Sequence, residues 1–293
     1  MPHDVTEAPG VALVRPPGPR LAEGLVTHID RRPVDVALAR RQHEAYTAAL
    51  AAAGWRIHRV PPADDLPDAV FVEDTVVVAD GLAVLGRCGA PQRRAEVAGT
   101  ERAVRELGLR IERIEAPATL DGGDVLQVGD TVYVGLSGRT NEEGVRRLAA
   151  LLGPLGRRVV PVRVAGALHL KSAMTALPDG TLIGMPDLVD ASALPGLRAA
   201  PEPAGSHVVV LGEEHVLLAA SAPRTATMLR AEGLRVTVVD ITEFEALEGC
   251  VTCLSVLVPG RPPHRSRGEA RAGDAGRAVP GPGAAAAGKP PAP

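Results

Sequence analysis

Aromatic residues, cysteines and long apolar segments are scarce in this 293-residue chain, and each shortage excludes a class of protein. Aromatic side chains make up 2% of the residues, so Val, Leu, Ile and Ala must build the core. Three cysteines are too few for the disulfide framework of a small secreted protein. No apolar run reaches the roughly 18 residues that a membrane-spanning helix needs. The first residues also lack a signal-peptide pattern, so we expect a cytoplasmic protein.

A large excess of charge of one sign is also missing. The chain carries 32 Lys and Arg against 35 Asp and Glu, a formal net charge of −3. This balance argues against a dedicated nucleic-acid-binding protein, which would be strongly basic. We therefore expect a small-molecule ligand, with neither nucleic acid nor membrane as a partner, and a homodimer stays open.

The composition changes near Gly260. Residues 261–293 contain 9 Ala, 7 Pro and 6 Gly, and Val279 is the single large aliphatic residue among them. A segment of this kind has too little apolar surface to bury and is predicted to be disordered. We expect residues 1–260 to form one domain that carries the function, and residues 261–293 to be a passive Pro/Ala/Gly-rich tail.

The body of the chain repeats a short pattern. In each copy, a glycine follows a helix-like stretch and precedes alternating apolar and polar residues, as a helix-terminating glycine before a strand would. The copies begin at Gly54, Gly108 and Gly233, with a weaker one at Gly156. The helices predicted before the three clear copies span residues 34–53, 93–107 and 222–232.

Turn residues between apolar runs predict a β-hairpin in each repeat. These turns lie at residues 80–81, 129–130, 179–180 and 212–214. A fifth hairpin would pair Val11–Arg15 with Val251–Val258, and joining the first strand to the last would close a ring without free edges. The sequence therefore predicts an α/β fold: a propeller of five ββαβ modules with pseudo-fivefold symmetry.

The cysteines are the first candidates for chemistry. Cys88 follows a predicted strand without a polar cluster nearby and is interpreted as structural. Cys250 and Cys253 form a C-x-x-C pair. A redox motif would begin a helix and a zinc knuckle would need a second pair, whereas Thr252–Val258 is predicted to be a strand. One cysteine of the pair is therefore a candidate nucleophile, which would need a histidine partner.

His169 lies between two leucines, and several carboxylates occupy similarly apolar settings. Glu73 and Asp74 fall within a predicted buried strand, Asp68 precedes them, and Asp121 begins another strand. Each has an ordinary alternative, such as a core histidine, a turn aspartate or an internal arginine partner for Glu73 or Asp74. Together, at equivalent ends of the repeats, the acids predict a negative pocket, and a planar guanidinium is the cation that pairs best with carboxylates.

Two arginines follow the first two predicted hairpins at corresponding positions. Arg93 and Arg139 would both reach one carboxylate of a ligand bound in the acidic pocket. The predicted ligand is therefore cationic at one end and carries a carboxylate at the other, as arginine does.

Five motifs carry a family resemblance: FVED, LDGGDV, GLSGRTN, LHLKS and TCLSVL, in this order within residues 10–258. In combination they resemble dimethylarginine dimethylaminohydrolase, a family of the guanidino-group-modifying (amidinotransferase) superfamily. The resemblance implies a five-module α/β propeller. It also implies hydrolysis of asymmetric dimethylarginine or monomethylarginine to L-citrulline and dimethylamine or methylamine, through a covalent thiouronium on cysteine. No metal and no organic cofactor are implied.

The resemblance assigns roles to individual residues. Cys253 corresponds to the nucleophile, His169 to the general acid/base, and Asp121 to the carboxylate that orients the histidine. The residues that correspond to substrate contacts are Leu25 (in a lid), Asp68 (at the amino group), Glu73 and Asp74 (at the guanidinium), Arg93 and Arg139 (at the carboxylate), Ser172, and Leu247 (through its backbone).

One departure from the family pattern, at Cys250, and one residue within its motifs, Lys171, bear on the alternatives. Cys250 replaces the usual aliphatic residue, which raises the question of oxidation with Cys253. Lys171 stands where arginine deiminases usually carry an aspartate, which disfavours an arginine deiminase, another guanidine hydrolase or an amidinotransferase. A non-catalytic arginine-binding module would need no nucleophile, and a redox protein built on the C-x-x-C pair is the remaining alternative.

Overall fold

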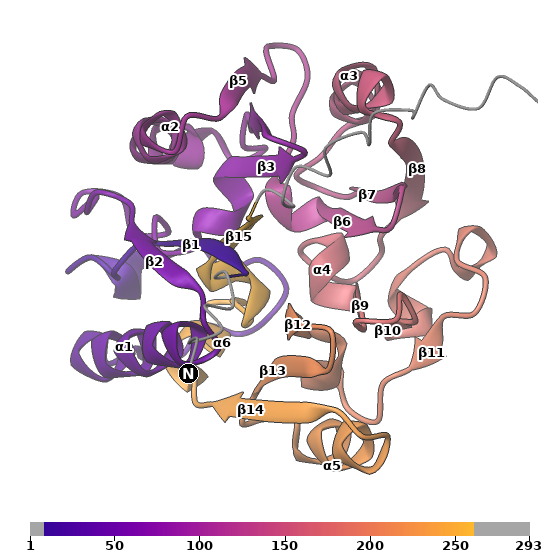
Figure 1. Ribbon diagram of the computed structural model, residues 1–293. Helices are drawn as coiled ribbons and strands as arrows, with labels where there is room; N and C mark the ends of the chain where they lie inside the picture. The colour runs from indigo at the N-terminus through magenta and orange to yellow at the C-terminus, as the bar shows by residue number, and fades with distance from the viewer. Residues whose placement is uncertain (1–8, 261–293) are drawn as a thin grey trace, which may run out of the picture. The chain divides into compact units, whose positions relative to one another are not determined.

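The computed structural model describes residues 9–260, which form five three-stranded sheets of one design (Figure 1). In each sheet the middle strand pairs antiparallel with one neighbour and parallel with the other. The sheets contain β15 (Val256–Pro259), β1 (Gly10–Val14) and β2 (Arg56–Arg59); β3 (Val76–Ala79), β4 (Leu82–Leu85) and β5 (Arg110–Arg113); β6 (Val125–Val128), β7 (Thr131–Leu136) and β8 (Arg158–Arg163); β9 (Met174–Ala176), β10 (Leu182–Gly184) and β11 (Arg198–Ala199); and β12 (Val209–Gly212), β13 (His215–Ala219) and β14 (Arg235–Val239).

The first sheet joins strands from the two ends of the described chain. In β1, Val11 lies opposite Val258 of β15, and Leu13 lies opposite Val256. The five sheets follow one another around a ring (Figure 1), with β15 and β1 side by side. This pairing confirms the predicted fifth hairpin and the predicted five-module α/β propeller.

Helices cross from the second to the third strand of four modules and lie at the outside of the ring (Figure 1). They are α1 (Val36–Ala52), α2 (Val97–Glu106), α3 (Glu142–Leu152) and α5 (Pro223–Ala231). The predicted helix 93–107 begins instead as a 3₁₀ helix, Pro91–Glu96, before α2. The fourth module departs from the ββαβ prediction, because 3₁₀ turns at Pro186–Leu188 and Ala191–Ala193 replace its crossover helix. Two further short helices are α4 (Leu170–Ala173) and α6 (Thr242–Glu245).

The repeated glycines and turns form for local steric reasons. Gly108 follows α2 with φ +71° and Gly233 follows α5 with φ +94°, a left-handed conformation that ends a helix and that glycine adopts without strain. In the turn between β3 and β4, Asp80 and Gly81 both have positive φ, as a two-residue type I′ hairpin requires.

The core lies between neighbouring sheets. Valines and leucines from adjacent modules pack together, as Val77 and Val84 of the second sheet do with Val125 and Val132 of the third. Each fully buried side chain of this size contributes roughly 1.5–3 kcal/mol to folding. Outer strands such as β5 carry exposed arginines, which discourage pairing with other sheet edges.

The predictions for residues 261–293 lie outside the described residues. Within residues 9–260, no helix has both the length and the apolar character needed to cross a membrane.

Candidate active site

Two tight turns carry the nucleophile and the paired acids. Glu73 and Asp74 lie in a 3₁₀ helix, Val72–Thr75, and Cys253 lies in another, Thr252–Leu254. The prediction that these residues lie within strands was therefore wrong, because β3 and β15 begin only after the turns. Since a 3₁₀ helix has three residues per turn, consecutive side chains diverge strongly. Asp74 and Cys253 consequently line one cavity, whereas Glu73 and Thr252 line another.

The first of these, which we call the small cavity, brings together most of the predicted site residues. Its volume is about 20 Å³, close to the space of a single water molecule. The predicted residues that line it are Leu25, Asp68, Asp74, Arg93, Arg139, His169, Leu247 and Cys253. Four lining residues were not predicted: Phe71, Leu168, Glu248 and Gly249. The small cavity is thus a polar site with room for little more than one water molecule.

His169 is held between two carboxylates. Its Nε2 lies 3.1 Å from Oδ2 of Asp121, and its Nδ1 lies 3.8 Å from Oδ1 of Asp74. Burial alone would lower the pKa of His169, but the carboxylates of Asp74, Asp121 and Asp124 outweigh it and raise the pKa to about 9. The histidine is therefore an imidazolium at neutral pH and can act as a general acid.

The LDGGDV motif supplies the close approach that this arrangement needs. Gly123 donates its backbone N–H to Oδ1 of Asp74 at 3.1 Å. A Cβ on Gly123 would lie 2.7 Å from Nδ1 of His169 and 2.6 Å from the same carboxylate oxygen. Only glycine leaves room for the histidine and the aspartate on this side of the backbone.

Asp124, the second acid of the motif, positions the neighbouring segments. Its Oδ1 accepts the backbone N–H of Leu170 at 2.9 Å, and its Oδ2 accepts the hydroxyl of Ser137 at 2.7 Å. Ser137 Oγ in turn accepts the backbone N–H of Arg139 at 3.0 Å. Burial raises the pKa of Asp124 to about 6. From the sequence, Asp124 stood out only as part of the LDGGDV motif and had no predicted role.

The two predicted clamp arginines are not equivalent. Arg93 donates from Nη1 to Oδ2 of Asp74 at 2.6 Å and from Nε and Nη2 to Glu96. Its Nη2 also faces the backbone carbonyls of Asp68 and Phe71, so its hydrogen-bonding groups already have partners. The structure thus shows the internal arginine partner for Asp74 that the sequence left as an alternative.

Arg139 is differently placed. Its Nη1 is buried without a hydrogen-bond partner among residues 9–260 and lies 4.0 Å from Oδ2 of Asp121. A buried donor of this kind is costly unless a ligand satisfies it. Arg139 is therefore the arginine in the small cavity that is prepared for an anion.

The lid predicted at Leu25 is fastened by two carboxylates. The backbone N–H of Leu25 donates to Asp68, at 3.0 Å from Oδ1. The backbone N–H groups of Thr27 and His28 donate to Glu248 at 2.6 and 2.5 Å. No motif pointed to Glu248, because its partners lie far away in the sequence. Of the segment from Leu25 to His28, Leu25 lines the small cavity, as its partner Asp68 and Glu248 do.

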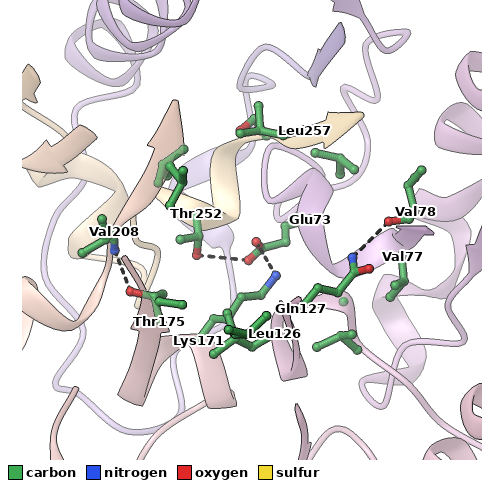
Figure 2. Close-up of a pocket in the computed structure, with 18 of the residues that line it drawn as sticks. Glu73, Val77, Val78, Leu126, Gln127, Lys171, Thr175, Val208, Thr252 and Leu257 are labelled. Atoms are coloured by element: carbon green, nitrogen blue, oxygen red, sulfur yellow. Dashed lines mark hydrogen bonds and ion pairs between the residues drawn. The ribbon is translucent and has the colours of Figure 1, made fainter. Parts of the chain in front are cut away.

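Three predicted site residues do not line the small cavity: Asp121, which contacts it through its hydrogen bond to His169, and Glu73 and Ser172. Glu73 lines a second cavity of about 380 Å³, which we call the large cavity (Figure 2). There Lys171 Nζ donates to Oε1 of Glu73 at 2.6 Å, and Thr252 Oγ1 donates to Oε2 at 3.2 Å. Burial raises the pKa of Glu73 to about 7. Ser172 lines neither cavity, and its carbonyl accepts from Nε2 of His207 at 2.9 Å.

Hydrogen bonds hold the turn that carries Cys253. The hydroxyl of Tyr46, from α1, donates to the carbonyl of Val251 at 2.8 Å and lies 2.8 Å from Oγ of Ser255. The hydrogen bond between Cys250 and Cys253, together with burial, raises the pKa of Cys253 well above its usual value. The nucleophile is therefore a neutral thiol before a ligand binds.

Cys88 is buried, as a structural role would require, but it is not remote from polar groups. Burial raises the pKa of Cys88 well above its usual value, and the nearby charge of Asp121 raises it further while that of Arg93 opposes the shift, which corrects the expectation that no polar cluster lies nearby. Within the described residues, Asp74, Asp121 and His169 offer possible metal-ligand atoms within 4.8 Å of one another. Arg93 already neutralises Asp74.

The chain is similar to several known proteins. A family model described as arginine deiminase matches residues 36–200. Dimethylarginine dimethylaminohydrolase of Streptomyces coelicolor is 58% identical over 246 residues, covering 84% of this chain and 95% of that protein. The enzyme of the same name from Pseudomonas aeruginosa is 34% identical over 248 residues, covering 83% of this chain and 97% of its own length.

Solved structures of dimethylarginine dimethylaminohydrolases have a fold similar to that of this chain. A cysteine-to-serine variant of the Pseudomonas aeruginosa enzyme, complexed with citrulline, superposes with a TM-score of 0.77 at 33% identity. That match covers 85% of this chain and 99% of the other. A histidine-to-glycine variant of a dimethylarginine dimethylaminohydrolase, bound as an adduct with S-methyl-L-thiocitrulline, also has a TM-score of 0.77, at 32% identity.

The fold is that of the enzymes that modify guanidino groups. Its five-module ring holds a cysteine, a histidine and aspartates in one cavity. Within that class, the chain belongs to the dimethylarginine dimethylaminohydrolase family.

Proposed function

We propose that the protein hydrolyses Nω-methylated L-arginines, namely asymmetric dimethylarginine and monomethylarginine, to L-citrulline and dimethylamine or methylamine. One observation carries this proposal: the small cavity places the thiol of Cys253 together with the imidazolium of His169 and the carboxylate of Asp74. These groups suit a reaction in which a nucleophile attacks a cationic carbon and an amine leaves.

The charges of the small cavity suit the two ends of the substrate. Asp74 and Asp121 attract the guanidinium, whereas the unpartnered Nη1 of Arg139 accommodates the carboxylate. Asp68 would bind the substrate amino group after releasing the backbone of Leu25. Because the closed cavity has room for about one water molecule, the substrate enters only when the segment carrying Leu25 moves away.

The first half of the reaction forms a covalent intermediate. The bound cation lowers the pKa of the neutral Cys253 thiol, so the thiol releases its proton to solvent water and the sulfur attacks the guanidinium carbon. The C–N bond to the methylated amine then breaks, and the His169 imidazolium supplies the proton to the departing nitrogen. A thiouronium remains on Cys253.

In the second half, His169 is neutral and takes a proton from water. The water oxygen attacks the thiouronium carbon, the C–S bond breaks, and L-citrulline leaves. Asp121 keeps the imidazole oriented through its hydrogen bond to Nε2 and stabilises the positive charge that returns to the ring.

The decisive experiment compares substrates. The purified full-length chain is incubated with asymmetric dimethylarginine, monomethylarginine or L-arginine, and citrulline and the released amine are measured. We expect rapid turnover of both methylated substrates and little turnover of arginine. Preferred turnover of arginine with release of ammonia would instead assign the arginine deiminase activity suggested by the matching family model.

Lys171 favours the methylarginine reading. Arginine deiminases usually carry an aspartate at this position. Here the residue is a lysine whose ammonium is paired with Glu73, so no carboxylate is available at this position to bind an unsubstituted guanidinium. We also propose a cytoplasmic location, which the three free thiols support. The homodimer stays a prediction that light scattering of the full chain would test.

A further inference from the structure

Cys250 and Cys253 are close enough to react with each other. Their sulfur atoms are 3.1 Å apart, against about 2.05 Å in a disulfide bond. The backbone N–H of Cys253 donates to the carbonyl of Cys250 at 3.1 Å, which defines a tight turn. In such a turn the Cα atoms are less than about 7 Å apart, near the span that a disulfide bridges. A movement of about 1 Å by the side chains is therefore sufficient to bond the two sulfurs.

The two thiols differ in their access to small molecules. Cys253 lines the small cavity, which the substrate must enter, whereas Cys250 does not and is only 2% exposed. Cys250 Sγ lies 3.2 Å from Oγ1 of Thr252, which lines the large cavity. An oxidant that enters through the small cavity, as the substrate does, therefore reaches Cys253 before it reaches Cys250.

We propose that this pair is a reversible oxidation site, at which a hydroperoxide converts the nucleophile into a Cys250–Cys253 disulfide. The Cys253 thiol gives up its proton as its sulfur attacks one peroxide oxygen, the O–O bond breaks, and a sulfenic acid forms; the leaving oxygen takes the proton and departs in an alcohol or in water. The Cys250 sulfur then attacks the Cys253 sulfur and displaces water. Overall, two thiols lose two electrons and two protons, and one peroxide is reduced.

The disulfide both inactivates the protein and protects Cys253 from further oxidation. A disulfide removes the nucleophile, so hydrolysis stops, but a dithiol restores both thiols by exchange. Without a neighbouring thiol, a sulfenic acid on Cys253 is open to further oxidation to the sulfinic acid, which dithiols do not reverse. This regulatory inference rests on the proposed function, because Cys253 is the nucleophile there.

The test compares full-length wild type with Cys250→Ala and Cys88→Ser, each against its own untreated sample. All three are exposed to hydrogen peroxide, and half of each sample then receives dithiothreitol. Two readouts are taken: citrulline formation, and mass spectrometry of the peptide that contains residues 250 and 253. Cys88→Ser is the matched control, because it removes the third buried thiol of the described residues and leaves the pair intact.

We expect wild type and Cys88→Ser to lose most activity in peroxide, to show a Cys250–Cys253 linkage lighter by two hydrogens, and to recover more than half of the activity with dithiothreitol. Cys250→Ala should lose activity without recovery and gain oxygen on Cys253. Irreversible inactivation of wild type, or a peptide without the linkage, would overturn the proposal. The mass readout needs no turnover, so it separates failure of this inference from failure of the proposed function.

Discussion

The small and large cavities of this protein divide two pairs of consecutive residues between them, Glu73 and Asp74 and Thr252 and Cys253, yet the two linings differ in chemistry. The small one has about 20 Å³ and gathers the carboxylates, the arginines, the histidine and the nucleophile. The large one has about 380 Å³, and its walls are mainly valine and leucine, with the Lys171–Glu73 ion pair on one side (Figure 2).

The difference shows that concentrated charge, and not volume, marks the reactive site. In the small cavity, charged groups lie close enough to shift one another's pKa values, as Asp74 and Asp121 do for His169. In the large cavity, Lys171 and Glu73 neutralise each other. Substitution of neighbouring residues that face different cavities tests this contrast directly.

The largest contrast is expected at the nucleophile. Cys253→Ser should abolish turnover, with a loss of up to about six orders of magnitude in kcat, as removal of a nucleophile costs in other enzymes. Thr252→Val alters the adjacent side chain, which faces the large cavity, and should cost far less. Steady-state citrulline assays measure both variants, and calorimetry with citrulline checks that Cys253→Ser still binds ligand. An equal loss for both variants would show that the two cavities are not functionally distinct.

The acidic neighbours should show the next largest difference. Asp74→Asn removes one of the two carboxylates that pair with the buried guanidinium of Arg93, the other being Glu96, and should destabilise the fold by about 1–3 kcal/mol. It should also lower kcat strongly, because His169 loses a carboxylate that keeps it protonated. Glu73→Gln should leave kcat within about tenfold, because it acts in the large cavity. Urea unfolding and kinetics of both variants give the comparison, and a reversed order of their kcat values would refute it.

The two cavities should also be separable by pH. The folded-state pKa values of Glu73, about 7, and His169, about 9, both lie above the usual values, so the folded protein binds more protons than the unfolded chain. The stability from Glu73 is present below about pH 4.5 and is lost as the pH rises through 7. That from His169 is present below about pH 6.5 and is lost as the pH rises through 9.

Each of these groups contributes roughly 3 kcal/mol at most, since one pKa unit corresponds to about 1.4 kcal/mol. Glu73→Gln should flatten the free energy of unfolding between about pH 4.5 and 7, and His169→Gln should flatten it between about pH 6.5 and 9. Urea unfolding across this pH range measures both. Curves unchanged by the two substitutions would mean that the raised pKa values do not exist.

The smallest effect is expected at Arg139, and it sharpens the difference between the two arginines. Arg139→Ala should raise KM by about one to two orders of magnitude, because a charge-assisted hydrogen bond is worth roughly 1.5–3 kcal/mol. The penalty should shrink for a methylated agmatine, which has no carboxylate. Kinetics of wild type and Arg139→Ala with both substrates provide the measurement. An equal penalty with both would mean that Arg139 is structural.

The ring could be predicted from the sequence because its signals are local. Glycines such as Gly108 and Gly233 stop helices, and turn residues such as Asp80 and Gly81 set the hairpins, so the module order follows from short patterns. The fourth crossover could not be predicted in this way, because its helix is absent and two 3₁₀ turns take its place.

Motifs in the sequence identified the residues of the candidate site, but they did not predict how those residues are arranged in space. An apolar run around Glu73 and Cys253 favours a strand, and tertiary packing overrides that preference with tight turns. Corresponding positions in the repeats suggested equivalent arginines, whereas Glu96 lies three residues after Arg93 and pairs with it. The lid contact of Glu248 joins segments far apart in the chain, and a single sequence carries no local signal for it.

The most direct test of the mechanism is to trap the covalent intermediate. S-methyl-L-thiocitrulline presents the same amidine carbon with methanethiol as the leaving group, and His169→Gly removes the base needed for the second half of the reaction. Mass spectrometry should then show an adduct on the peptide containing Cys253, and none in the double variant with Cys253→Ser. An adduct on Cys250 or Cys88, or citrulline formation by the double variant, would contradict the assignment of Cys253 as the nucleophile.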